Sequence, residues 1–106
     1  MPIKTVDVST LKKWLDNKEA VVVDVREPGE FHSGSIPGAN LLPLAMISND
    51  QLPALGGKKL VLHCRSGKRS ATACEKLLVR DPELELFNLE GGILAWMQAG
   101  MPLINH

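Results

Sequence analysis

The sequence lacks an excess of charge of either sign. Its 106 residues contain 12 Lys and Arg against 12 Asp and Glu, so the formal net charge is zero. A nucleic-acid-binding domain usually shows a basic excess or stripe, which is absent. The chain also has no apolar run approaching the ~20 residues that a membrane-spanning helix needs. Its first residues show no apolar stretch behind a basic start, so we expect no signal peptide. These absences argue against nucleic acid and membrane as partners.

Cysteine is scarce as well, with Cys64 and Cys74 as the two examples. Two cysteines are too few for a disulfide scaffold, and these two are not in C-x-x-C spacing. No histidine cluster accompanies them, so we expect no metal site. We expect a cytoplasmic protein, because that is where thiols stay reduced.

What is present is typical of one globular domain. Hydrophobic residues make up 44% of the chain and charged residues 23%, a composition that supports a packed core. The length suits a single domain over residues 1–106.

Apolar runs alternate with helical patterns along the chain. The continuous runs at 20–25 and 60–63 are typical of strands that are buried on both faces of a parallel sheet. Weaker strand patterns occupy 3–8, 39–42 and 84–89. The sequence therefore predicts an α/β fold: a three-layer domain with a central, mainly parallel sheet of about five strands and helices on both faces.

Helical patterns occupy the segments between these strands. The first helix carries Leu11, Trp14 and Leu15 on one face, with Ser9 or Thr10 as its cap. Short helical pieces are expected at 27–33 and 45–55. A longer helix is expected at 70–80, with Ala71, Cys74, Leu77 and Leu78 on its apolar face. The Gly91-Gly92 pair opens a last helix that carries Ile93, Trp96 and Met97.

The polar loop after the second buried run carries the candidate chemistry. Cys64 comes directly after this strand, and the cations Arg65, Lys68 and Arg69 follow within five residues. Loop N–H groups beside a helix N-terminus can form an anion-binding nest, which the flexibility of Gly67 allows. Such surroundings favour the thiolate, the nucleophilic form of cysteine. The loop is therefore a candidate site for an activated sulfur that holds an anion above it.

The other cysteine and the neighbouring histidine have simpler interpretations. Cys74 lies on the apolar face of its helix, which indicates a core residue. His63 precedes Cys64 on the strand, so its side chain is expected on the opposite face of the sheet, in a structural role.

Four motifs in order resemble those of the rhodanese (sulfurtransferase) family. They span nearly the whole chain and are residues 24–31 (DVREPGEF), 34–39 (GSIPGA), 64–70 (CRSGKRS) and 89–96 (LEGGILAW), the last followed by 99–102 (AGMP). The length is that of a single-domain member of this family.

The resemblance implies a sulfurtransferase that needs no cofactor. Cys64 would take the outer sulfur of an anionic donor such as thiosulfate and hold it as a persulfide. Cyanide or a thiol would then accept the sulfur, with a thioredoxin-like protein or another sulfur carrier among the candidate partners. The substrate-binding residues implied are Arg65, Ser66, Gly67, Lys68 and Arg69.

Two residues near the end of the first buried strand are expected to support the loop. Asp24 could pair with a loop cation or accept loop N–H bonds, or simply end the strand as a turn acid. Arg26 is expected to form an ion pair with Glu30 or another acid.

The sequence departs from the family pattern at two positions. The resemblance puts an acid, Glu30, where longer thiosulfate-using members have a donor-binding arginine, so any donor site must rest on the loop cations. Ser35 stands where a histidine is common.

Three alternatives remain beside thiosulfate sulfur transfer. Phosphatases and arsenate reductases on the same fold use Cys-x5-Arg, whereas here Arg69 is the fifth residue after Cys64 and Ser70 the sixth. Relatives that use 3-mercaptopyruvate have uncharged loops, unlike this one. A non-enzymatic interaction module would need neither Cys64 nor the cations.

Overall fold

The computed structural model describes residues 3–105 and contains one five-stranded parallel sheet. The strands are β1 (Lys4–Val6), β2 (Ala20–Asp24), β3 (Asn40–Leu41), β4 (Lys59–His63) and β5 (Leu86–Leu89). Their order across the sheet is β1-β5-β4-β2-β3, and every neighbouring pair is parallel. The α/β class and the parallel sheet predicted from the sequence are confirmed.

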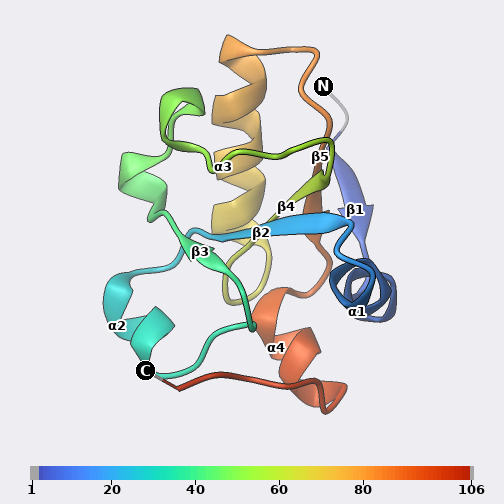
Figure 1. Cartoon of the computed structure of the whole chain (residues 1–106). Helices are drawn as coiled ribbons and strands as arrows, with labels where there is room; N and C mark the ends of the chain where they lie inside the picture. The colour runs from blue at the N-terminus through green and yellow to red at the C-terminus, as the bar shows by residue number, and fades with distance from the viewer. Residues whose placement is uncertain (1–2, 106) are drawn as a thin grey trace.

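Helices cover both faces of this sheet (Figure 1). The helices are α1 (Val8–Asp16), α2 (Pro28–His32), α3 (Lys68–Arg80) and α4 (Gly92–Gln98), with two 3-10 turns, η1 (Leu44–Met46) and η2 (Asn49–Gln51). One apolar cluster joins α3 to one face of the sheet, and a second joins α1 and α4 to the other. The expected three layers are therefore present.

The central strand β4 feeds both clusters because successive side chains point to opposite faces. Leu60 and Leu62 pack in the cluster with Leu77 of α3. Val61 packs in the other cluster, with Trp96 of α4. All five are 0% exposed. This burial on both faces explains why residues 60–62 form a continuous apolar run.

The first strand and helix differ from the prediction. The strand expected over 3–8 ends at Val6, and α1 begins at Val8. The cap is Asp7, whose Oδ1 accepts a hydrogen bond from the N–H of Thr10 at 2.8 Å, so the predicted caps are wrong. The carboxylate of Asp7 satisfies a free N–H at the helix start and so ends the strand early.

Two helical faces also differ in detail. Of the apolar residues on α4, Ile93 and Trp96 are buried, whereas Met97 is 50% exposed. On α3 the buried set includes Ala73 and Ser70, whereas Ala71 is only partly buried.

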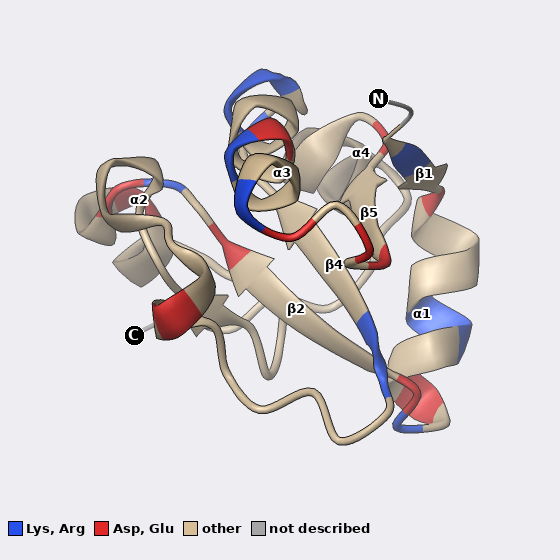
Figure 2. Cartoon of the chain, turned by 90° about the horizontal axis from the view of Figure 1, so that it is seen from above, with Lys and Arg blue, Asp and Glu red and all other residues tan. Residues whose placement is uncertain are grey.

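Charged residues are distributed over the whole domain. Both signs are interspersed along the ribbon, including along α3 (Figure 2). No helix within residues 3–105 is long and apolar enough to cross a bilayer.

The ends of β2 and β4 bring the candidate residues together. Asp24 and His63 are register partners in the last positions of these neighbouring strands. Because parallel strands end at the same edge of a sheet, Arg26 and Cys64 follow at this edge, as the sequence predicts.

Candidate active site

Cys64 lies at the base of a short loop between β4 and α3. Its residue surface is only 1% exposed. Gly67 is the N-cap of α3 and has a φ of 111°, a conformation that a residue with a Cβ rarely adopts. This turn directs the N–H of Gly67 to the Cys64 sulfur at an N···Sγ distance of 3.0 Å. The predicted nest is thus present, but the thiol lies deeper than an exposed loop cysteine would.

Opposing effects set the ionisation of this sulfur. Burial raises the pKa of the Cys64 thiol, but the hydroxyl of Ser70 and the backbone N–H groups of Ser70, Gly67 and Ser66 lower it. The donors prevail, so the pKa is lowered from the ordinary cysteine value. The site therefore favours the nucleophilic thiolate without a neighbouring imidazole at the sulfur.

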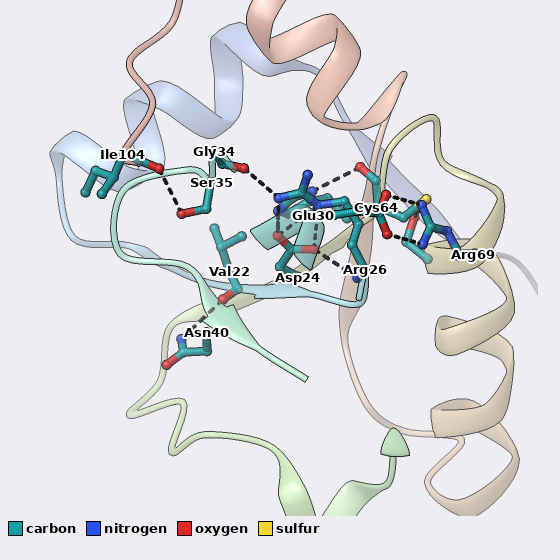
Figure 3. A network of polar contacts seen from close by, with 12 residues as sticks. Val22, Asp24, Arg26, Glu30, Gly34, Ser35, Asn40, Cys64, Arg69 and Ile104 are labelled. Carbon is teal, nitrogen blue, oxygen red and sulfur yellow. Dashed lines mark hydrogen bonds and ion pairs between the residues drawn. The ribbon is translucent and has the colours of Figure 1, made fainter. Parts of the chain in front are cut away.

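The three loop cations differ in their contacts. Arg65 and Lys68 are exposed and make no ion pair within residues 3–105. Arg69 instead forms a two-pronged bond with Glu30 of α2, with N···O distances of 2.8 and 2.9 Å (Figure 3). Hydrogen bonding to Arg69 lowers the pKa of Glu30 to about 2. Arg69, one of the three cations expected to hold an anion at the loop, is therefore already paired with an acid that is distant in sequence.

The acid and base near the end of β2 bind each other. Arg26 donates to both carboxylate oxygens of Asp24 at 2.7 to 3.0 Å and to the carbonyl oxygen of Gly34 at 2.8 Å. Asp24 is 0% and Arg26 6% exposed. The expected ion pair of Arg26 is therefore present with Asp24 as the acid. Oδ1 of Asp24 also accepts the backbone N–H of Arg26 at 3.0 Å, the contact expected of an acid in the turn that ends the strand (Figure 3).

His63 links this buried pair to the cysteine loop. Its Nδ1 lies 3.1 Å from the carbonyl oxygen of Cys64, and its Nε2 lies 3.6 Å from Oδ2 of Asp24. Burial lowers the pKa of His63, although the charge of Asp24 opposes this. The imidazole contacts the backbone of Cys64 and not the sulfur, which agrees with the structural role predicted for it.

The start of α4 holds the loop from the other side. The N–H groups of Ile93 and Leu94 donate to the carbonyl oxygens of Cys64 and Arg65 at 2.9 and 3.1 Å. Gly92 allows this approach, since a Cβ there would collide with the carbonyl group of Arg65.

Ser70 and Asn88 also belong to the site, although the sequence alone did not indicate a role for either. The Ser70 hydroxyl lies 3.5 Å from the Cys64 sulfur and 2.5 Å from Oδ1 of Asn88. Asn88 also donates from Nδ2 to the carbonyl oxygen of Gly67 at 3.1 Å. The available signal was an amide inside an otherwise apolar strand, at a position where β5 lies beside β4.

A hollow of about 440 Å³ is lined in part by Arg65 of the cysteine loop. Its walls are α2, Arg65, α4 and Leu103, and its apolar lining comes from Ile93, Leu94, Met97 and Leu103. Met97 and Leu103 are 50% and 38% exposed. An open, partly apolar surface therefore adjoins the cysteine loop.

The second cysteine, Cys74, lies in the apolar core. Burial raises the pKa of Cys74 to about 12, which agrees with its predicted place in the core. No group of three His, Cys, Asp or Glu that could hold a metal ion occurs in the described part of the chain.

Two known proteins are similar to this chain along most of its length. An uncharacterized protein of Synechocystis is 42% identical over 101 residues; the match covers 94% of this chain and 55% of that protein, so this chain spans about half of it. A sulfurtransferase of Allochromatium vinosum is 34% identical over 103 residues, covering 96% of this chain and 95% of that protein.

The fold and the sequence pattern point to one family. The crystal structure of a rhodanese-related protein from Thermoplasma volcanium superposes with a TM-score of 0.83 and 29% identity, covering 97% of this chain and 99% of that one. The sequence pattern of the rhodanese-like domain matches residues 7–99. This match includes the cysteine loop, the strands β4 and β5 and the helices α3 and α4. The chain therefore belongs to the rhodanese-like domain family.

Proposed function

We propose that the protein is a sulfurtransferase that carries a sulfane sulfur on Cys64. The observation that carries the proposal is the set of donors around one sulfur: the N–H of Gly67 at 3.0 Å and the hydroxyl of Ser70 at 3.5 Å. Donors arranged in this way stabilise a negative charge on sulfur. A thiolate and a terminal persulfide sulfur both carry such a charge.

The reaction proceeds in two steps. The Cys64 thiolate attacks the outer sulfur of thiosulfate, an S–S bond forms at Cys64, and sulfite leaves with the electron pair of the broken bond. An acceptor thiolate or cyanide then attacks the outer sulfur of the persulfide, which restores the Cys64 thiolate and releases a persulfide or thiocyanate. In each step one nucleophile displaces another from the transferred sulfur, as in thiol–disulfide exchange.

Donor selection rests on the two loop cations that make no ion pair within residues 3–105. Arg65 and Lys68 are exposed beside the loop, so they can attract an anionic donor. Glu30 holds Arg69 and adds a negative charge. We therefore propose a modest affinity for the doubly charged thiosulfate and a better fit for donors of lower charge.

The hollow beside Arg65 is a surface on which the sulfur acceptor can bind. The hollow beside Arg65 combines this cation with Leu94, Met97 and Leu103. It suits a thiol on a partly apolar molecule or on a protein sulfur carrier. Because Cys64 is only 1% exposed, the accepting thiol must reach into the loop.

Intact-mass spectrometry tests the proposal directly. Incubation with thiosulfate is expected to add the mass of one sulfur to the protein, and cyanide is expected to remove it as thiocyanate. The Cys64→Ala variant should gain nothing. The matched control is Cys74→Ala, which removes the buried thiol of α3 and should load like the parent.

A second donor separates the donor question from the function itself. If thiosulfate fails but a low-molecular-weight persulfide loads Cys64, the sulfurtransferase proposal stands and the donor assignment falls. If neither donor modifies Cys64, the sulfurtransferase proposal is overturned.

A phosphatase activity at the Cys64 loop is the first alternative. Arg69 stands one residue closer to the cysteine than in Cys-x5-Arg loops, and its guanidinium is already bound by Glu30. An anion above Cys64 would therefore have to compete with a carboxylate for it. Turnover of an aryl phosphate without any sulfur transfer would favour a phosphatase. An interaction module would instead keep its cellular role in a Cys64→Ser variant.

A further inference from the structure

The hydroxyl of Ser70 has more acceptors than hydrogens. Ser70 is the third residue of α3 and is fully buried. Its oxygen lies 2.5 Å from Oδ1 of Asn88, 3.2 Å from the carbonyl oxygen of Gly67 and 3.5 Å from the Cys64 sulfur. A hydroxyl carries one hydrogen, so it donates to one of the three at a time.

The amide of Asn88 faces this hydroxyl in a fixed orientation. Its Nδ2 donates to the carbonyl oxygen of Gly67 at 3.1 Å, which leaves Oδ1 directed at Ser70. The register of the sheet holds it there, because Asn88 is the partner of Leu62, two residues before Cys64. Of the three acceptors, Oδ1 is the nearest, so it takes the hydrogen while Cys64 is a neutral thiol.

Ionisation of the sulfur reverses this arrangement. A neutral thiol donates its proton to the oxygen of Ser70, and the Ser70 hydrogen continues the chain to Asn88. A thiolate has only lone pairs, so the Ser70 hydroxyl must turn toward it and leave Oδ1 of Asn88 without its hydrogen. Asn88 and the sulfur anion therefore compete for one hydrogen.

We propose that Asn88 is a positioning residue that controls the ionisation of Cys64 through the hydroxyl of Ser70. The proposal deepens the proposed function, because it concerns the same sulfur. Asn88 touches no reacting atom in the structure; it acts by holding the hydrogen that the sulfur anion needs.

The charged groups around Cys64 do not take part in this competition. They are Arg69 of α3, paired with Glu30 of α2; the buried pair of Asp24 and Arg26 after β2; and His63 of β4. Arg65 and Lys68 are exposed in the loop and at the start of α3. Substitution of Ser70 or Asn88 leaves all of these charges in place.

A double-mutant cycle measures the competition. The variants are Asn88→Leu, Ser70→Ala and the two combined, and the readout is the pH dependence of Cys64 alkylation by iodoacetamide, followed by intact mass. Cys74 does not interfere because its pKa is about 12. Asn88→Leu also removes the hydrogen bond to the carbonyl oxygen of Gly67. That loss occurs both with Ser70 and with Ser70→Ala, so the cycle separates it from the effect that depends on the hydroxyl.

The expected result is a change that depends on the hydroxyl. With Ser70 present, Asn88→Leu is expected to increase the thiolate population at a fixed pH by about three-fold or more relative to the same change in the Ser70→Ala background, the size expected for one hydrogen bond. The matched control is Asn40→Leu, which removes a similar amide on β3 that donates to the carbonyl oxygen of Val22. It should leave the alkylation profile unchanged.

Equal effects of Asn88→Leu in the two backgrounds, or a smaller thiolate population with Ser70 present, would overturn the proposal. If the leucine variant does not fold, Asn88→Ala removes the same acceptor with less bulk and gives the same comparison. Alkylation requires no sulfur donor, so this result is independent of whether the protein transfers sulfur.

Discussion

Glu30 shows how one residue changes the meaning of a motif. By the resemblance, this acid stands where longer thiosulfate-using members of the family have a donor-binding arginine. The structure adds that its carboxylate binds Arg69, 39 residues further along the chain. The local charge of the loop and its neighbour is therefore lower than the loop sequence suggests, by the charge of one carboxylate.

This ion pair predicts a defined loss of stability in acid. The pKa of Glu30 is lowered from 4.5 to about 2, chiefly by the hydrogen bond from Arg69. The stabilisation is therefore complete above about pH 4.5 and is lost as the pH falls toward 2. Urea unfolding at pH 5.5 and pH 3 is expected to show a smaller loss of unfolding free energy in Glu30→Gln than in the parent.

The control for this measurement is Glu83→Gln, at an exposed carboxylate that makes no ion pair in the described part of the chain. It should retain the parent's loss between the two pH values. The same loss in Glu30→Gln as in the parent would show that the pair does not stabilise the fold.

The residues that could be predicted are those adjacent in sequence. The nucleophile candidate and its loop follow from one segment, 64–70, and Cys74 follows from the helical pattern. The hydrogen bonds that Arg69 donates to Glu30 and Ser70 donates to Asn88 depend on how strands are ordered across the sheet. A single sequence does not state that order, so these partners came only with the structure.

At the scale of elements, α4 acts as a brace for the cysteine loop. Its first N–H groups bind the carbonyl oxygens of Cys64 and Arg65. The helix reaches them because Gly92 has no side chain at the point of contact. The Gly91-Gly92 pair, identified in the sequence as a helix start, therefore also sets the distance between two elements.

Substitution of Gly92 is expected to displace the loop. In Gly92→Ala the new Cβ would collide with the carbonyl group of Arg65, in addition to the strain of a φ of 61°. Backbone strain of this kind costs ~1–2 kcal/mol by itself. We expect a larger loss of unfolding free energy, together with a higher pKa of Cys64 as its N–H donors move away.

Gly100→Ala is the matched control for Gly92→Ala. Gly100 has a similar φ of 73°, but a Cβ there meets nothing within 4 Å. It should show the strain cost without any change in Cys64 alkylation. An equal loss of stability and an unaltered thiol pKa in both variants would argue against the brace.

The elements themselves divide into those that were predictable and those that were not. The runs that form β2 and β4 were identified closely, because burial on both faces makes residues 20–23 and 60–62 continuously apolar. The start of α1 was misplaced, because Val6 and Val8 continue an apolar pattern across the turn at Asp7. The start of α1 is set by the hydrogen bond between Asp7 and the N–H of Thr10. The spacing of apolar residues does not indicate this bond.

At the scale of the whole molecule, a formal net charge of zero conceals a local field. Lys68 and Arg65 are exposed and lie within four residues of the cysteine, in a segment from 65 to 70 that contains no acid. Such a field acts on the approach of ions before any contact forms, and salt weakens it.

Two alkylating agents of different charge can measure this field. The ratio of Cys64 alkylation rates for anionic iodoacetate and neutral iodoacetamide is expected to fall as ionic strength rises. Charge reversal in Lys68→Glu is expected to lower the ratio about five-fold at low salt, from Coulomb's law in water over about 8 Å. Lys76→Glu makes the same change further along α3, and its ratio should stay close to that of the parent. Equal effects of the two reversals would mean that net charge, and not placement, governs anion approach.

The sheet also has a consequence for self-association. Its two edge strands, β3 and β1, have only two and three residues, and the longest strands lie inside. A protein without net charge has little long-range repulsion to keep its copies apart. Short edges offer few free backbone groups on which another chain could extend the sheet. Protection against edge-to-edge aggregation is thus built into the strand lengths, where a change of pH or salt cannot remove it.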